Sequence, residues 1–174
     1  MNKPYIVVSC PLDTFSGYGA RARDVARALV NSEKYDVKFL SQRWGNTPFG
    51  FLDENDPEDK KLLDRIINPP VQRQPDVWIQ ISVPDEFQKV GKFNIGITAG
   101  IETDLCDVRF IQGANNMDLI LGSSKHALFS LQNTQYEQKD KAGNKVGVIK
   151  LETPTDILFE GIDLELRNNF VFYT

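Results

Sequence analysis

The stretch that decides the fold runs from residue 5 to residue 30 and reads YIVVSCPLDTFSGYGARARDVARALV. Residues 5–9 form an apolar run typical of a buried strand, and residues 17–30 repeat apolar side chains at helical spacing. A loop that ends in Ser-Gly-Tyr-Gly joins the two segments. The sequence therefore predicts a strand, a glycine-containing loop and an amphipathic helix.

This loop predicts an anion site. We expect Ser16 to cap the helix, and Gly17 and Gly19 to adopt backbone angles that other residues resist. The first N–H groups of a helix lack internal acceptors and lie at the positive end of its dipole, so those of residues 17–20 are candidate donors to a phosphate or carboxylate. Arg21 and Arg23 are candidate cationic contacts. The alternative is that the glycines only form the turn and both arginines are solvated surface charges.

The rest of the chain alternates strands with helices. Further strands are predicted at residues 36–40, 76–83, 93–98 and 117–122. One helix opens at Asp56 and Pro57 with a buried stripe of Leu62, Leu63, Ile66 and Ile67, and another is capped by Ser123 or Ser124. Residues 145–151 and 157–159 are expected to form flanking strands. The alternation predicts an α/β Rossmann-like three-layer sandwich with a mainly parallel sheet, in a single domain over residues 1–174.

Composition narrows the class of protein. The chain has 174 residues, a net charge of −4, 41% hydrophobic and 25% charged residues, which is typical of a globular protein. It contains no long basic tract, so we expect no nucleic-acid partner. No apolar run approaches membrane-spanning length and the start lacks a signal-peptide pattern, so we expect a cytoplasmic protein without a transmembrane segment. Cys10 and Cys106 are expected to be free thiols, and neither a metal nor a cofactor is expected.

Two residues outside the glycine loop are candidate catalytic groups. His126, the only histidine, lies near the start of a helix that follows a strand, and Glu102 follows another strand end in a glycine-containing loop. Side chains at such strand ends hold ligands in many α/β proteins. A packed or surface histidine and a helix-capping acid are the alternatives. Trp44 lies in a long loop, where it either stacks on a ligand or fixes the loop to the body.

Residues 17–22 also fit the dinucleotide pattern G-x-G-x-x-A. In that fingerprint the glycines follow the strand almost immediately, whereas here residues 11–15 intervene. The second strand should also end in an acid for the ribose, and here it is followed by Arg43 instead. An NAD(P)-binding oxidoreductase domain is therefore the less favoured interpretation.

The order of several motifs resembles a known family. The glycine loop is followed by residues 75–81 (PDVWIQI), 94–104 (NIGITAGIETD), 118–126 (DLILGSSKH) and 158–163 (LFEGID). This order resembles the N-terminal half of a family 4-like glycosyltransferase of the GT-B class, which has two Rossmann-like domains. Residues 160–174 then resemble the start of the crossover to the second domain.

The resemblance implies a function. Such an enzyme transfers a sugar from a nucleotide-sugar to an acceptor, and its N-terminal domain mainly shapes the acceptor side. By that resemblance Gly17 and Gly19 face the cleft near the donor phosphates, and His126 and Glu102 approach it. The family's E-x7-E acids belong to the donor-binding domain. Glu152 and Glu160 have this spacing, but Pro154 prevents the helix that the motif needs.

The sequence therefore favours the acceptor-side half of a nucleotide-sugar-dependent glycosyltransferase of the hexosyltransferase type. We expect it to be truncated and inactive without its donor-binding domain. A stand-alone module that binds a phosphate-bearing ligand is the alternative.

Overall fold

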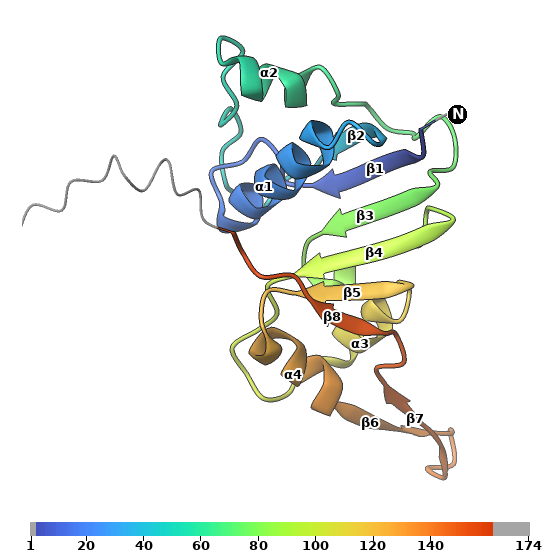
Figure 1. The fold of residues 1–174 in the computed structure, drawn as a ribbon. Coiled ribbons are helices and arrows are strands. Elements are labelled where there is room, and N and C mark those ends of the chain that lie inside the picture. The colour runs from blue at the N-terminus through green and yellow to red at the C-terminus, as the bar shows by residue number, and fades with distance from the viewer. Residues whose placement is uncertain (1–2, 162–174) are drawn as a thin grey trace, which may run out of the picture.

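The computed structural model describes residues 3–161, and its centre is one sheet of six parallel strands (Figure 1). The strands lie in the order β2-β1-β3-β4-β5-β8. Their bounds are Tyr5–Cys10 for β1, Asp36–Ser41 for β2, Val77–Ile81 for β3, Phe93–Thr98 for β4, Leu119–Gly122 for β5 and Thr155–Ile157 for β8. The predicted α/β class with a Rossmann-like, mainly parallel sheet is confirmed.

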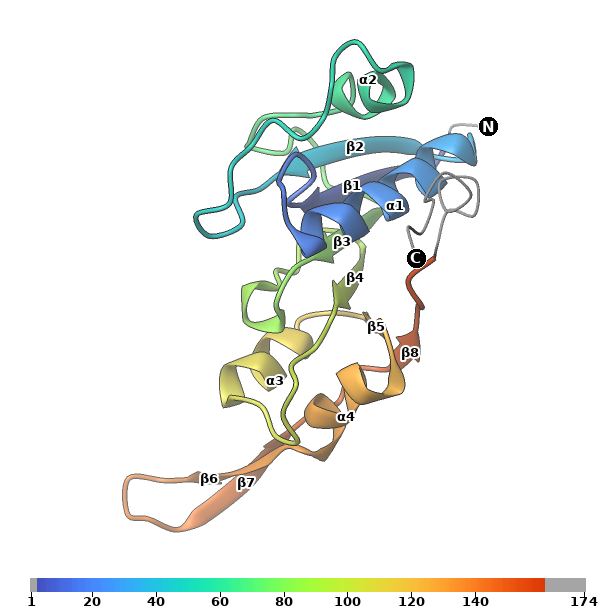
Figure 2. The same cartoon turned by 90° about the vertical axis from the view of Figure 1, so that its left-hand side faces the viewer.

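Helices cover both faces of the sheet and create two apolar cores (Figure 2). α1 (Gly17–Asn31) and α2 (Pro57–Leu63) pack on one face, and α3 (Val108–Ala114) and α4 (Lys125–Asn133) pack on the other. Every residue of β1 is buried. This explains why its sequence is a continuous apolar run rather than an alternating one, since strands of a parallel sheet are covered on both sides.

The sheet reverses its strand order beside β1. β1 pairs with β2 on one side and with β3 on the other, and all pairs in this sheet are parallel. The carboxyl ends of the strands therefore share one edge. In open α/β sheets, ligands bind outside this edge at the point where the order reverses.

α2 is shorter than the sequence predicts. The helix ends at Leu63, and residues 65–67 instead run parallel to β2, with the Phe39 N–H donating to the Arg65 carbonyl at 2.9 Å. Ile66 packs into the core under α1, whereas Ile67 packs into the core on the opposite face. Successive side chains on opposite faces are the mark of extended chain. A helical stripe that includes both isoleucines is therefore wrong.

α3 was not predicted, because the helix has only seven residues and carries a glycine inside it. Asp107 caps it by accepting the Arg109 N–H at 2.8 Å. A Cβ atom on Gly113 would lie 1.9 Å from the Pro84 carbonyl oxygen, in the short 3-10 turn Pro84–Glu86. Glycine is there to let two backbones approach, a tertiary requirement that the local pattern does not reveal.

The C-terminal part of the described chain adds a hairpin and the last sheet strand. β6 (Gln135–Lys139) and β7 (Lys145–Lys150) pair antiparallel and project from the body (Figures 1 and 2). The predicted strand at 145–151 is confirmed, while the one at 157–159 is displaced to β8. The predicted crossover at residues 160–174 lies outside the described residues, apart from 160 and 161.

Candidate functional site

A relay of hydrogen bonds fixes the loop before α1. The Gly19 N–H donates to Ser16 Oγ at 2.9 Å, Ser16 Oγ lies 2.8 Å from Thr14 Oγ1, and Thr14 Oγ1 donates to the Pro11 carbonyl at 2.9 Å. Since the Thr14 proton goes to Pro11, the Ser16 proton goes to Thr14. The predicted N-cap at Ser16 is confirmed, and its hydroxyl is occupied within the loop.

The two glycines of the loop have a different purpose from the one predicted. Neither Gly17 nor Gly19 has a positive φ, so the expected left-handed angles are wrong. A Cβ on Gly19 would lie 2.5 Å from the Thr14 carbonyl oxygen, so Gly19 permits a close approach of the loop to the helix. A Cβ on Gly17 would meet nothing within 4 Å, because this residue borders open space.

Two backbone donors at the start of α1 are unpaired among the described residues. The Gly19 N–H is taken by Ser16 Oγ, and the Ala20 N–H donates to the Ser16 carbonyl at 2.9 Å. The N–H groups of Gly17 and Tyr18 have no acceptor within residues 3–161. The predicted set of four donors is therefore reduced to two, which lie at the positive end of the α1 dipole.

A pocket of about 230 Å³ opens beside these donors. It lies at the carboxyl edge of the sheet, where the ends of β3, β4 and β5 meet the start of α1. Its lining consists of Gly17, Tyr18, Arg21, Trp44, Ile81, Ile97, Thr98, Ala99, Ser123 and Glu160. This is the location that the parallel topology predicts for a ligand.

Arg21 lines the pocket and also holds the chain that leaves β8. Its guanidinium donates to the Phe159 carbonyl at 3.1 Å and to the Leu158 carbonyl. These bonds use two of its five N–H donors, and the other three have no partner among residues 3–161.

Arg23 is not a surface charge. Only 4% of it is exposed, its Nη1 donates to the carbonyls of Leu12 and Thr14 at 2.9 Å each, and its guanidinium lies 3.4 Å from the ring centre of Phe51. The alternative in which Arg23 is a solvated surface charge is therefore wrong. The residue is absent from the pocket lining and instead ties together the loops that follow β1 and β2.

Tyr18 and Trp44 form one side of the pocket. Their rings stack with centroids 4.1 Å apart, and the Tyr18 hydroxyl lies 3.1 Å from Thr98 Oγ1 and accepts the Ala99 N–H at 3.1 Å. The start of α1 is thus bound to the end of β4. Sequence reasoning missed Tyr18 and Thr98, although a polar residue at the end of a buried strand was the available signal.

Ser123 and Ser124, which follow β5, have different structural roles. Ser124 is the cap of α4, since its Oγ accepts the Ala127 N–H at 3.1 Å. Ser123 lines the pocket, and its hydroxyl forms no hydrogen bond within the part of the chain that the structure describes.

His126 and Glu102 are both exposed and outside the pocket lining. Neither side chain has a hydrogen-bonding partner among residues 3–161. Neither residue therefore contributes to the pocket beside the start of α1.

Both cysteines are free and buried. Burial raises the pKa of the Cys10 thiol to about 12, well above its ordinary value of 9.0. The described residues contain no cluster of three or more His, Cys, Asp or Glu side chains placed to hold a metal ion.

None of the helices within residues 3–161 is both long and apolar enough to cross a membrane. Comparison of the chain with family models, with curated proteins and with solved structures found no match.

Proposed function

We propose that the pocket at the carboxyl edge of the sheet binds a phosphate-bearing ligand. The observation that carries this proposal is the convergence of the unpaired Gly17 and Tyr18 N–H groups with Arg21 around one cavity. Oriented backbone donors and an arginine are the groups that proteins use for phosphate oxygens.

The ligand class proposed is a nucleotide-sugar, of which this pocket holds the sugar-phosphate part. On this proposal the chain is the acceptor-side Rossmann-like domain of a GT-B glycosyltransferase that resembles family 4. The fold class and the position of the pocket are those that the resemblance implies. The motif order along the chain supports the proposal further.

The size of the cavity limits what it holds alone. Pockets for drug-sized ligands occupy about 300–1,000 Å³, whereas this one measures about 230 Å³. A phosphate with an attached sugar therefore fits better than a complete nucleotide-sugar. The remainder of such a ligand would lie against a donor-binding domain.

The described residues supply binding rather than catalysis. They orient the phosphates through Gly17, Tyr18 and Arg21, while His126 and Glu102 lie outside the cavity. A departing nucleotide diphosphate needs positioned donors on both sides of the cleft. Transfer would accordingly require the second domain.

A module that binds a phosphate ester without transferring it is the second candidate, and the small volume of the pocket favours it. An NAD(P)-binding domain is disfavoured because Gly17 and Gly19 lie inside α1 and not in a turn that follows the strand directly.

Calorimetric titration tests the proposal. We expect uridine, guanosine and adenosine diphosphates, and their sugar conjugates, to include at least one binder whose affinity falls in Arg21→Gln. Arg109→Gln is the matched control, because Arg109 is an exposed arginine on α3, outside the pocket lining. Absence of binding for every compound, or equal losses in both variants, would contradict the proposal.

A further inference from the structure

The segment of residues 158–161, here called the strap, crosses the carboxyl edge of the sheet after β8 (Figure 1). The Leu158 N–H donates to the Gly122 carbonyl at 2.9 Å, and the Leu158 and Phe159 carbonyls accept from Arg21. The strap therefore reaches from the end of β5 to the start of α1, and it places Glu160 in the lining of the pocket.

Little apolar burial holds the strap in place. Leu158 is 38% exposed and Phe159 is 70% exposed. Its position depends mainly on hydrogen bonds to Gly122 and Arg21. The strap thus forms one wall of the pocket. Arg21, which is proposed to hold a phosphate, also fixes this wall in place.

Glu160 adds a carboxylate, which is a hydrogen-bond acceptor, to this wall of the pocket. Its carboxylate forms no hydrogen bond and no ion pair with any residue of the described chain. An ionised carboxylate is a hydrogen-bond acceptor only, so it takes bonds from hydroxyl groups and repels anionic oxygens. The pocket therefore combines N–H and guanidinium donors for an anion with an acceptor that disfavours one.

We propose that Glu160 is a specificity-determining residue that selects phosphate esters carrying a hydroxylated ring over simple phosphates. This inference rests on the proposed phosphate-bearing ligand and adds a requirement to it. The phosphate lies toward Gly17, Tyr18 and Arg21, and the sugar hydroxyls donate to Glu160. A phosphate ligand without hydroxyl groups is repelled by the Glu160 carboxylate and donates no hydrogen bond to it.

The test compares two probes, glucose 1-phosphate and methyl phosphate, by calorimetric titration of the full chain. The wild type is expected to bind glucose 1-phosphate more tightly. In Glu160→Ala, affinity for glucose 1-phosphate should fall and affinity for methyl phosphate should rise, each about two- to fivefold for an exposed charge. Opposite changes for the two probes are a result that a merely structural role of Glu160 cannot produce.

Two further variants sharpen the experiment. Glu160→Gln keeps a hydroxyl acceptor but loses the charge, so methyl phosphate should bind more tightly while most of the preference for the sugar phosphate remains. Glu152→Ala is the matched control, because Glu152 is exposed in the same C-terminal part of the chain but lies outside the pocket lining. It should leave both affinities unchanged.

The outcomes separate the two proposals. Changes in the same direction for both probes, or no change in Glu160→Ala, overturn the role of Glu160 and leave the phosphate site standing. Failure of the wild type to bind either probe overturns the phosphate site itself, and the role of Glu160 with it.

Discussion

Arg21 and Arg23 are two positions apart on α1 and have different tasks. A helix turns about 100° per residue, so residues two apart point to different sides. Arg21 lines the pocket, whereas Arg23 is buried beneath the loops. The sequence predicted an arginine pair beside the anion site, but which of the two faces the pocket depends on loops that fold over α1 from elsewhere in the chain.

Substitution of Arg23 should therefore affect stability more than binding. Arg23→Ala leaves the buried carbonyls of Leu12 and Thr14 without their donor, at a cost of about 1–3 kcal/mol for each unsatisfied buried group. Urea denaturation should show a clear loss of stability. If stability is unchanged and only ligand affinity falls, Arg23 is a ligand contact and not a tie between the loops.

Gly17 and Gly19 provide a matched pair of sites for substitution by alanine. Gly19→Ala should destabilise the fold strongly, because its Cβ would lie 2.5 Å from the Thr14 carbonyl oxygen. Gly17→Ala should keep the melting temperature within a few degrees, since its Cβ meets nothing within 4 Å, yet it adds a methyl group at the pocket lining. Thermal melting of both variants checks this order, and a larger loss for Gly17→Ala would contradict it.

Cys10 makes stability depend on pH. The buried thiol has a pKa raised to about 12, whereas the unfolded thiol ionises near its ordinary value of 9.0. The neutral Cys10 thiol stabilises the fold fully below pH 9. This stabilisation is lost as the pH rises toward 12, because the unfolded thiol ionises before the folded one. At pH 10 the loss is about 1.4 kcal/mol. The wild type should lose that much more stability than Cys10→Ala between pH 8 and pH 10 in urea denaturation; parallel pH profiles would rule this out.

At the scale of elements, the first five strands of the sheet along the chain were predicted near their observed places, whereas β8 was displaced and β6 was not predicted. β1 stands out in the sequence as a continuous apolar run because it is covered on both faces. The seven-residue helices α2 and α3 are too short for a helical period to stand out. Their ends depend on contacts with β2 and with the turn at Pro84.

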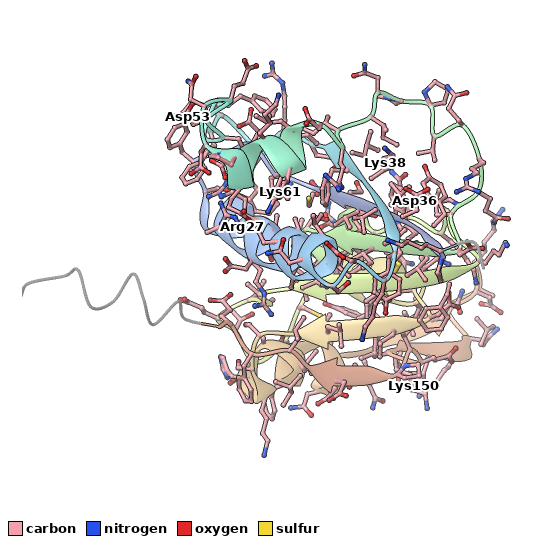
Figure 3. All side chains as sticks on the ribbon, turned by 45° about the horizontal axis from the view of Figure 1, so that its top comes forward. Arg27, Asp36, Lys38, Asp53, Lys61 and Lys150 are labelled. Carbon is pink, nitrogen blue, oxygen red and sulfur yellow. The ribbon has the colours of Figure 1, made fainter. Side chains whose placement is uncertain are left out.

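Tertiary contacts also decide how α2 is anchored. Arg27 on α1 forms an ion pair with Asp59 on α2 at 2.8 Å, and Asp59 also accepts the Asp53 N–H at 3.2 Å; Figure 3 labels Arg27 and Asp53. Leu62 then enters the core with 1% of its surface exposed, whereas Leu63 is only partly buried.

Truncation of the two leucines should separate their contributions. Leu62→Ala is expected to cost about 2–5 kcal/mol of the free energy of unfolding, as for other fully buried leucines. Leu63→Ala should cost less, because this side chain keeps part of its surface in water. Chemical denaturation measures both values, and an equal or reversed order would show that the buried face of α2 is different.

At the scale of the whole molecule, the topology brings to one edge residues that are far apart in the sequence. Tyr18, Thr98 and Glu160 line one pocket because parallel strands end together. The resemblance implied that Gly17 and Gly19 face this edge, and of the two Gly17 lines the pocket. The sequence did not predict that residues 158–161 return to α1, because that path rests on two hydrogen bonds from Arg21.

On the proposed function the described residues form only one wall of a two-domain cleft, so these 174 residues alone should not transfer sugar. Phosphates held on one side remain in contact with water, where each electrostatic contact is several times weaker than in an enclosed site. Incubation with radiolabelled nucleotide-sugars should release no sugar above the uncatalysed rate. Clear turnover by this chain would refute the proposed division of labour between two domains.

The central claim is that the start of α1 holds phosphate, and amide NMR during titration with inorganic pyrophosphate tests it most directly. The account predicts that the Gly17 and Tyr18 N–H signals shift most and saturate together, while the amides around Glu102 and His126 stay in place. Saturable shifts confined to residues near Glu102 and His126, with Gly17 and Tyr18 unmoved, would contradict it.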